Sequence, residues 1–430
     1  MNKKYRILAI TYDYYPDNSP NTYRWHNILT EWANEGHEVF VISAQKPGLS
    51  SYEIAEGVRV YRTGKSWLEI LKSKLPKTVK LEDQSDTANR SLTKESMVKR
   101  IYNSTFKKIY FPDFAFLWLS PAKRLAAKLI KEHGINNLIT VSWPFTDHLI
   151  GYQLQKQHKL NWIADTIDPF YLSDAVNNKF LYKKANRSIE NKVLSKASSI
   201  TVLTHKLKKK YIELYPSLKD KIFVNHNIFI PYPIKKCTNQ DSNKIKLVFF
   251  GTLIPETRSP ITLLKMMDLI DRAENTSMIE LHIYGDTTQC DAEFEMYNHL
   301  IGRRVYIHGL ISKEQVKDNS ATADILVNIG NLNEYQEPSK IIEYVYLNKP
   351  ILNICSIVND SSKELLDKYH LNFNFYKEDL TIESRKEDLF DFIFHSHDDS
   401  FKQTDEGLLA NYLLPEVQSR YLKLLEDNTQ

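Results

Sequence analysis

Glycine and cysteine are both scarce in this sequence of 430 residues. It has 12 glycines, fewer than half of the ~7% found in average proteins, and none of them forms a GxGxxG or GxxxxGKS/T motif. The three cysteines lie far apart, at Cys237, Cys290 and Cys355, and include no CxxC pair. These absences exclude the usual dinucleotide fingerprint, a P-loop, a disulfide framework and a cysteine zinc site, and they favour a reducing cytoplasm.

Long apolar runs and metal-binding spacings are missing as well. The first apolar run, residues 7–10, is far shorter than the core of a signal peptide, and no stretch approaches the ~18 apolar residues of a membrane span. The histidines show no HxH or HExxH spacing, and no GxSxG elbow is present. We therefore expect a cytoplasmic chain that uses neither a metal centre nor a serine-hydrolase mechanism.

Positive charge is concentrated in one segment. The net charge is only +4, but residues 62–110 contain 12 Lys and Arg against 5 Asp and Glu. Several of these lysines recur near Trp67 and Leu71, so a short helix beginning at Ser66 would separate a basic face from an apolar face. The segment is either a solvated insertion or a patch that makes peripheral contact with anionic lipid at the inner face of the plasma membrane.

Short β-branched runs alternate with helical patterns in both halves of the chain, which is typical of parallel sheets covered by helices. In the first half we expect strands at 5–11, 39–43, 137–142, 162–165 and 199–204, and helices at 23–35, 120–133 and 184–196. In the second half we expect strands at 245–250, 279–284, 305–308, 324–329 and 350–354, and helices at 260–272, 292–301 and 338–347. A further helix begins at Ser312, which forms a capping box with Gln315.

The two halves define two domains. Residues 1–228 form the first, with the basic insertion 62–110, and residues 245–410 form the second. Residues 229–244 contain prolines and no helical period, as expected of a linker, and residues 411–430 form a C-terminal helix able to pack back on the first domain. The predicted fold class is α/β, with two Rossmann-like parallel-sheet domains facing a cleft. Ligands in such sheets bind outside the carboxyl ends of the strands.

One segment of the second domain brings a guanidinium to a strand end. In FFGTLIPETRSP, residues 249–260, the strand ends at Gly251, where backbone is able to approach a ligand closely. Arg258 follows at the start of a helix, a position that favours an anion. The alternative is an ordinary turn with an exposed arginine.

A second segment, PSKIIEYVYLNKP, predicts a phosphate site built without glycines. Pro338 fits the first helical position, which would leave the N–H groups of Ser339, Lys340 and Ile341 free, with the charge of Lys340 added. Glu343 lies one turn further along, where a carboxylate is able to accept two ribose hydroxyls. A surface glutamate on an amphipathic helix is the alternative.

Acidic residues end two strands of the first half. Asp165 and Asp168 are expected at the edge of the cleft, where carboxylates bind sugar hydroxyls or take part in proton transfer. A turn or cap role for Asp168 fits the spacing equally well. His148 in SWPFTDH is a further candidate, although a lone histidine more often packs or caps than catalyses.

Five motifs, in order along the chain, resemble those of family-four glycosyltransferases of the GT-B fold, in the branch that builds bacterial surface polysaccharides. After the opening ILAITYDYYPDNSPNTYRW and GHEV, they are FPDFAFLWLSPA, TVSWPFTDHLIG, WIADTIDPF, GTLIPETRSP and PSKIIEYVYLNKPIL. The resemblance departs from the family's pattern at several points. Ser19-Pro20 replaces a Gly-Gly pair, Ile167 replaces the arginine before Asp168-Pro169, and Asn225-His226-Asn227 replaces an Asn-Gly pair. A further departure concerns the acids of the donor site. Two glutamates eight residues apart are expected, but Tyr335 stands eight residues before Glu343, with Glu334 and Glu337 out of register.

The resemblance implies transfer of a sugar, with retention and without a metal or other cofactor, from a UDP- or GDP-linked donor to a lipid-linked or polysaccharide acceptor. Such a reaction belongs to capsule, O-antigen or exopolysaccharide synthesis. The resemblance assigns the diphosphate to Arg258, Ser339 and Lys340 and the ribose to Glu343, and it assigns the acceptor to the first domain. Taking the residues and the resemblance together, we expect Gly251 and Glu337 to join the donor site, Asn18, Ser19 and Asp165 to lie on the acceptor side, and His148, Asp168 and Arg258 to act in catalysis.

Two other functions remain open. One is a sugar-nucleotide epimerase of the same fold. The other is a non-enzymatic protein that binds anions or nucleic acid through runs such as residues 205–211, although no nucleic-acid-binding motif is present and we expect no nucleic-acid partner.

Overall fold

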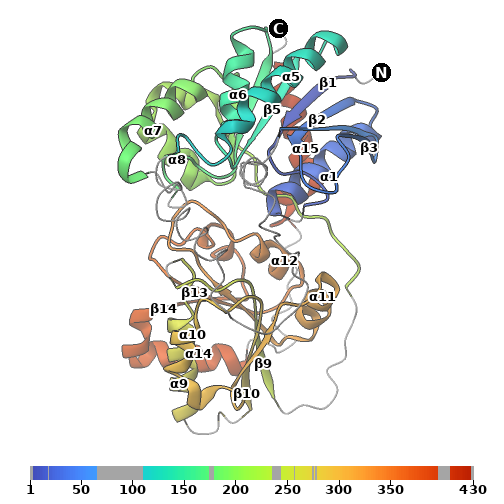
Figure 1. The fold of residues 1–430 in the computed structure, drawn as a ribbon. Coiled ribbons are helices and arrows are strands. Elements are labelled where there is room, and N and C mark those ends of the chain that lie inside the picture. Colours follow the sequence, from blue (N-terminus) through green and yellow to red (C-terminus); the bar gives the residue numbers. More distant parts are fainter. Residues whose placement is uncertain are drawn as a thin grey trace, which may run out of the picture. The chain divides into compact units, whose positions relative to one another are not determined.

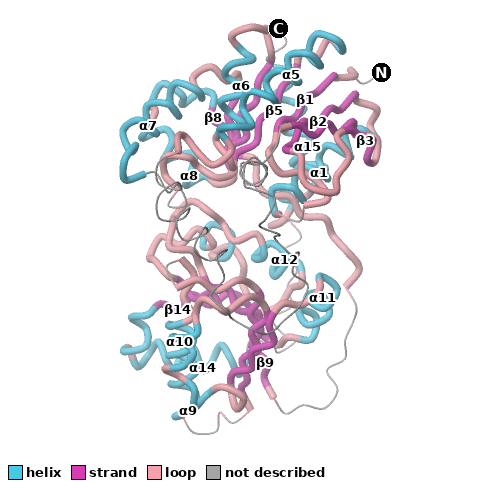
Figure 2. The backbone as a smooth tube through the Cα atoms, viewed as in Figure 1, coloured by secondary structure: helices cyan, strands magenta, loops and turns pink. Residues whose placement is uncertain are grey.

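The computed structural model describes residues 3–17, 19–64, 110–173, 179–234, 244–255, 257–273, 276, 278–395 and 407–427. The chain divides into two units. Unit 1 comprises residues 1–225 and 417–430, and unit 2 comprises residues 226–416. Each unit is built on one sheet with helices packed on it (Figures 1 and 2). The interfacial helix expected to begin at Ser66 lies outside the described residues. Of the segment 62–110, the structure describes residues 62–64 and 110.

Unit 1 contains an eight-stranded sheet in the order β3-β4-β2-β1-β5-β6-β7-β8. All neighbouring strands are parallel except β3 and β4, which form an antiparallel hairpin that the sequence pattern did not predict. The strands are β1 (Arg6–Ile10), β2 (Glu38–Ala44), β3 (Tyr52–Ala55), β4 (Val58–Thr63), β5 (Asn137–Ser142), β6 (Asn161–Thr166), β7 (Ser199–Val202) and β8 (Ile222–Val224).

Within the described residues, the helices that pack on this sheet are α1 (Pro20–Asn34), α5 (Leu119–His133), α6 (Thr146–Gln155), α7 (Lys179–Leu194), α8 (His205–Leu214) and α15 (Leu414–Asp427). α1 buries Trp25, Ile28, Leu29 and Trp32, the face that its 3.6-residue period predicts. α5 ends at Gly134, whose φ of 60° is the left-handed conformation that glycine adopts without strain.

The C-terminal helix α15 returns to unit 1, where Figure 1 shows it in red beside α1. Its Tyr421 Oη accepts a hydrogen bond from Arg24 Nη2 at 2.8 Å and donates to Asp165 Oδ1 at 2.6 Å. Asn225, the last residue of unit 1 before the chain enters unit 2, also contacts this helix: its Nδ2 donates to the carbonyl of Val417 at 3.1 Å. The C-terminal segment is therefore part of the core of unit 1.

Unit 2 contains a six-stranded parallel sheet in the order β11-β10-β9-β12-β13-β14. Its strands are β9 (Ile245–Phe250), β10 (Ile279–Tyr284), β11 (Val305–Gly309), β12 (Ile325–Ile329), β13 (Ile351–Cys355) and β14 (Asn372–Tyr376). Its helices are α9 (Ile261–Arg272), α10 (Asp291–Glu295), α11 (Lys313–Thr322), α12 (Lys340–Tyr346), α13 (Lys363–Leu366) and α14 (Glu383–His395). The predicted capping box of Ser312 and Gln315 is present at the start of α11.

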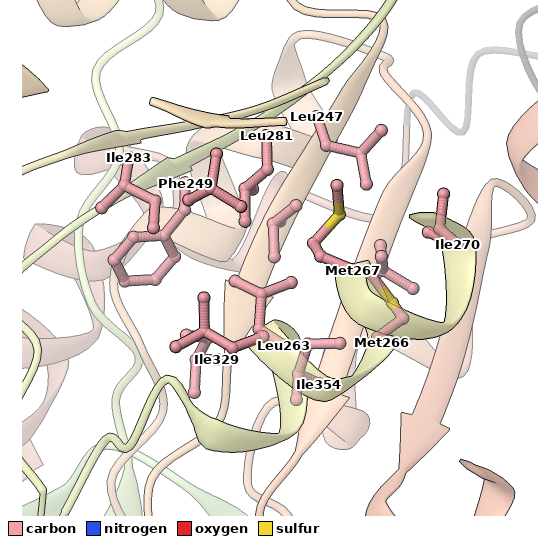
Figure 3. Packing of buried hydrophobic residues seen from close by; sticks show 14 of the residues in the cluster. Leu247, Phe249, Leu263, Met266, Met267, Ile270, Leu281, Ile283, Ile329 and Ile354 are labelled. Carbon is pink, nitrogen blue, oxygen red and sulfur yellow. The ribbon is translucent and has the colours of Figure 1, made fainter. Parts of the chain in front are cut away.

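One hydrophobic core of unit 2 forms between α9 and the sheet, and another forms around α12. Figure 3 shows Leu263 and Met267 of α9 against Leu247 and Phe249 of β9, all of them buried. Burial of each such side chain stabilises the fold by about 1.5–3 kcal/mol. The helix expected at 292–301 is shorter, because the chain leaves helical geometry at Tyr297 (φ −119°), whose ring packs against this core.

Candidate functional site

The order of the strands in unit 2 marks where a ligand should bind. Starting from β9, the chain first builds the sheet in one direction, through β10 and β11, and then returns to build β12, β13 and β14 on the other side. Open α/β sheets bind ligands outside the carboxyl ends of the strands at such a reversal, here between β9 and β12. Gly251 follows β9 and Asn331 follows β12, so both lie at this point.

The backbone after β9 is unusually close to the backbone after β10. A Cβ atom at Gly285 would lie 1.9 Å from the carbonyl oxygen of Gly251, so only glycine fits there. Gly251 and Gly285 have φ angles of 153° and 142°, which other residues rarely adopt. The two glycines let these backbone segments pack closely together, and the side chains of Phe249 and Arg258 lie beside Gly251.

Arg258 is delivered to the same edge by a tight loop. Its N–H donates to Ile254 O at 2.8 Å, and Ile254 N donates back to Arg258 O at 3.1 Å. In the side chain, Nη2 donates to Asn331 Oδ1 at 2.9 Å, while Nε is buried with no hydrogen-bond partner. Burial lowers the pKa of this guanidinium.

Lys340 is the first residue of α12, and its Nζ lies 5.6 Å from the ring centre of Phe250 at the end of β9. The pKa of Lys340 falls to about 8, chiefly because the ammonium is largely buried. The charge of Arg258 lowers it further, and the charge of Glu343 opposes the shift. The two cations are therefore close enough to repel each other.

Neither cation forms an ion pair or a hydrogen bond with a carboxylate of the described residues. Arg258 donates to the amide of Asn331, and the charge of Asp360 favours its protonated form. Lys340 is likewise favoured in its charged form by Glu343, but burial outweighs that effect. Burying charges that are only partly compensated is unfavourable, and an anion that reached both groups would relieve that cost. This combination makes the edge between β9 and β12 a candidate anion site.

The start of α12 differs from the expectation. The helix begins at Lys340, two residues later than predicted, and Ser339 at its cap is exposed and makes no side-chain capping bond. The N–H of Ile341 is not free, because it donates to Pro338 O at 3.2 Å in a tight turn. With seven residues in the helix, the positive charge at this site comes from Lys340 and Arg258 more than from the helix dipole.

Two glutamates of the expected donor site bind tyrosine hydroxyls. Glu343, in the first turn of α12, accepts a hydrogen bond from Tyr232 Oη at 2.6 Å. Glu337 accepts one from Tyr412 Oη at 3.3 Å. Both carboxylates are only half-buried, so each retains exposed surface. Nothing in the sequence pattern indicated these tyrosine partners.

In unit 1, Asp165 and His148 are both buried. Asp165 is fully buried and accepts hydrogen bonds from Trp25 and Tyr421, a placement that favours a structural role over contact with an acceptor. The ring of His148 lies between the hydroxyls of Thr140 and Thr166, and burial lowers its pKa to about 3. His148 is therefore neutral near pH 7, and its placement fits the packing alternative better than catalysis.

Asp168 is half-buried in the loop after β6, and its carbonyl accepts a hydrogen bond from Ser142 Oγ at 2.9 Å. Glu190 of α7, which the sequence analysis did not name, has a buried carboxylate that binds the backbone following Asp168. It accepts from Phe170 N at 3.0 Å and from Tyr171 N at 3.3 Å. The backbone that carries Asp168 is thus fixed on both sides.

Two further buried acids lie near the reversal of strand order in unit 1, between β1 and β5. Asp147 Oδ2 accepts a hydrogen bond from Tyr12 N at 2.9 Å, and Asp113 accepts from Thr146 N at 2.8 Å. Burial raises the pKa of both carboxyls. Of the two residues expected on the acceptor side beside β1, Ser19 caps α1, and Asn18 lies outside the described residues.

Two other kinds of feature are absent from the described residues. No group of three or more His, Cys, Asp or Glu side chains is arranged to hold a metal ion in the described ranges. Of the helices within those ranges, none combines the length and apolar character that crossing a bilayer requires.

Comparison with known proteins gives no sequence relative. The chain matches no protein-family model and no curated protein. Solved structures do match over nearly the whole length. A glycosyltransferase from Rickettsia africae is 14% identical with a TM-score of 0.62, and the match covers 99% of each chain.

Two further structures extend this likeness. The lipopolysaccharide outer core galactosyltransferase WaaB is 13% identical with a TM-score of 0.59, covering 98% of this chain and 99% of that chain. A trehalose-6-phosphate structure from E. coli, bound with UDP-2-fluoro glucose, is 9% identical with a TM-score of 0.63 and the same coverage. At such identities the likeness concerns the fold. Together with the two parallel sheets, it confirms the expected fold class: the chain has the GT-B fold.

Proposed function

We propose that this protein is a glycosyltransferase that takes a sugar from a UDP- or GDP-linked donor bound by unit 2. The observation that carries the proposal is the pair of partly buried cations, Arg258 and Lys340, that form no ion pair with a described carboxylate beside the glycine-lined edge of β9. A nucleoside diphosphate has the charge and the narrow backbone that fit this edge. The GT-B fold is consistent with this chemistry but does not by itself fix the reaction.

Transfer of the sugar leaves charge on the departing diphosphate. In our proposal, Arg258 and Lys340 stabilise that charge, Gly251 lets the backbone approach the phosphates, and the exposed cap at Ser339 lies beside them. Glu343 binds the ribose, and Glu337 is placed on the side of the donor sugar. Fixed positive groups perform this task without moving during the reaction, which is why they lower its barrier.

We further propose that unit 1 binds the acceptor, a lipid-linked or saccharide molecule of bacterial surface-polysaccharide synthesis, and that the sugar is transferred with retention. Support comes from the motif resemblance and from the galactosyltransferase of lipopolysaccharide outer core among the solved structures of similar fold. Peripheral membrane contact through residues 62–110 remains part of this proposal and rests on sequence alone.

One experiment tests the proposal directly. The purified protein is incubated with a panel of UDP- and GDP-sugars, with and without lipid-linked acceptors, and release of UDP or GDP is measured. We expect release from one donor class, faster with acceptor, and an anomeric proton coupling in the product that matches the donor. A changed sugar on an intact nucleotide would instead identify an epimerase, and absence of binding to every nucleotide would contradict the proposal.

Nucleotide affinity should fall as the pH rises from 7 to 9. Lys340, with a pKa of about 8, is mostly protonated at pH 7 and mostly neutral at pH 9, whereas the diphosphate is already ionised at pH 7. If only the protonated form binds well, the affinity for UDP or GDP falls about tenfold over this range. Calorimetry at pH 7, 8 and 9 measures the affinity for UDP or GDP.

The matched variant for this test is Lys340→Arg. Its guanidinium stays charged throughout the range, so its affinity should change little between pH 7 and 9. An equal fall in the variant and the wild type would show that another group titrates, and no fall in the wild type would place the ammonium of Lys340 away from the diphosphate.

Asp168→Asn should lower sugar transfer at least about tenfold, because a neutral amide replaces the carboxylate in hydrogen bonds to a sugar hydroxyl. Affinity for UDP or GDP should not change, since the residue belongs to unit 1 and the nucleotide to unit 2. Steady-state transfer and calorimetry on the same preparation separate the two effects. A parallel loss of nucleotide binding would remove Asp168 from the role proposed for it.

A further inference from the structure

Tyr232 lies in the segment predicted to be a linker, yet it contacts α12 at two points and α11 at a third. Its hydroxyl donates to Glu343 Oε1 at 2.6 Å, and its carbonyl accepts a hydrogen bond from Tyr346 Oη at 2.5 Å. Lys317 Nζ of α11 lies 4.1 Å from the centre of its ring, within the range of a cation–π interaction. These three contacts fix the position of the Tyr232 side chain.

The backbone just before Tyr232 is fixed to unit 2 as well. Phe229 N donates to Tyr412 O at 2.6 Å, and Leu414 N donates to Phe229 O at 3.3 Å. The ring of Phe229 packs on that of Tyr346, with 4.7 Å between their centres. The start of the linker is therefore part of the framework of unit 2, and the position of the Tyr232 hydroxyl is set by that framework.

The contact leaves most of the Glu343 carboxylate available. A carboxylate offers about four lone-pair positions, and the Tyr232 hydroxyl occupies one of them, on Oε1. No described residue donates a hydrogen bond to Oε2. Burial, and then the bond to Glu343 and its charge, raise the pKa of Tyr232, so its hydroxyl remains a donor at physiological pH. Two ribose hydroxyls are thus able to bind while the tyrosine stays in place.

We infer that Tyr232 is a positioning residue of the nucleotide site, whose hydroxyl orients the Glu343 carboxylate so that its free oxygen meets the ribose diol. The inference rests on the proposed function and deepens it. In this inference, the segment before β9 that carries Tyr232 takes part in recognition of the ribose. Unaided, the glutamate side chain would have to give up rotational freedom when the nucleotide binds, which weakens binding.

The test compares ribose recognition in Tyr232→Phe and wild type. Calorimetry with UDP and GDP identifies the base that binds, and the same measurement is repeated with the 2′,3′-dideoxy form of that nucleotide. In Tyr232→Phe we expect the affinity for the ribonucleotide to fall about three- to tenfold, with the affinity for the dideoxy form unchanged. Glu343→Gln should reduce the same preference for the ribonucleotide further.

Tyr306→Phe is the matched control, because it also removes a phenol that donates to a glutamate, Glu280, in unit 2 but away from this site. It should leave both affinities at their wild-type values. An equal loss for ribo and dideoxy nucleotides in Tyr232→Phe would mean a purely structural role, and tighter ribonucleotide binding would mean that the hydroxyl competes with ribose; either result overturns the inference. If wild type binds neither nucleotide, the proposed function fails and the inference fails with it.

Discussion

Replacing Arg258 by alanine is expected to weaken binding of UDP or GDP at least tenfold and to slow sugar transfer about 100- to 1000-fold. Loss of one fixed donor to a developing negative charge typically costs about 2.7–4 kcal/mol of transition-state stabilisation, and the ground-state diphosphate carries part of the same charge. The effect should be large here because the guanidinium is partly buried and held by Asn331, which limits screening by water and salt.

Two variants keep this result interpretable. Arg272→Ala removes the same charge from unit 2, but from an exposed side chain of α9 paired with Asp268, and should leave nucleotide affinity unchanged. Arg258→Lys keeps the charge and loses the planar fork, so its affinity should lie between those of wild type and Arg258→Ala. Calorimetry gives the affinities, and release of UDP or GDP in the presence of acceptor gives the transfer rates. Wild-type affinity in Arg258→Ala would remove this residue from the donor site.

The sequence predicted the elements around this site well because they are local. The strand over 245–250 has the predicted bounds, and the helix over 260–272 begins one residue late, since apolar runs and caps are read from neighbouring residues. Gly251, Arg258 and Lys340 were predictable as site candidates because each follows a strand or starts a helix. The pKa shifts of Arg258 and Lys340 were not predictable, because they depend on burial and on charged residues from other parts of the fold.

The partners of the site residues were beyond sequence reasoning for a geometric reason. Tyr232 and Glu343 are 111 residues apart, and they meet only because the start of the linker folds onto α12. Asn331, which holds Arg258, is 73 residues away from it. A pattern read along the chain indicates which residues face a sheet edge, but it does not tell which side chains from other elements reach the same edge.

Asp165 shows the opposite case. The sequence pattern correctly placed it near the end of a strand, but a distant segment of the chain encloses it. It belongs to β6, as the sequence predicted, and from there it was expected to face an acceptor. The return of α15 across unit 1 puts the Tyr421 hydroxyl on its carboxylate, and Arg24 and Trp25 of α1 lie beside it. A contact of this kind spans 256 residues.

Replacing Asp165 by alanine is therefore expected to destabilise unit 1 strongly. The carboxylate accepts hydrogen bonds from Trp25 Nε1 at 2.9 Å, Thr201 Oγ1 at 2.5 Å and Tyr421 Oη at 2.6 Å, and its Oδ2 lies 4.0 Å from Arg24 Nε. The Arg24 side chain is 1% exposed, so the variant would leave a buried guanidinium without its counter-charge. Removing one partner of a buried ion pair costs about 3–5 kcal/mol of unfolding free energy.

Tryptophan fluorescence during a urea titration measures this loss in unit 1 alone, because all six tryptophans precede residue 226. Tyr421→Phe is the control: it removes the two hydrogen bonds of the Tyr421 hydroxyl, from Arg24 and to Asp165, and keeps the carboxylate, so it should cost about 2 kcal/mol, less than Asp165→Ala. Without urea, Asp165→Ala should bind UDP or GDP as wild type does, since unit 2 is untouched. If Asp165→Ala keeps the wild-type unfolding midpoint and loses only sugar transfer, then Asp165 binds the acceptor, as its place at the end of a predicted strand first suggested.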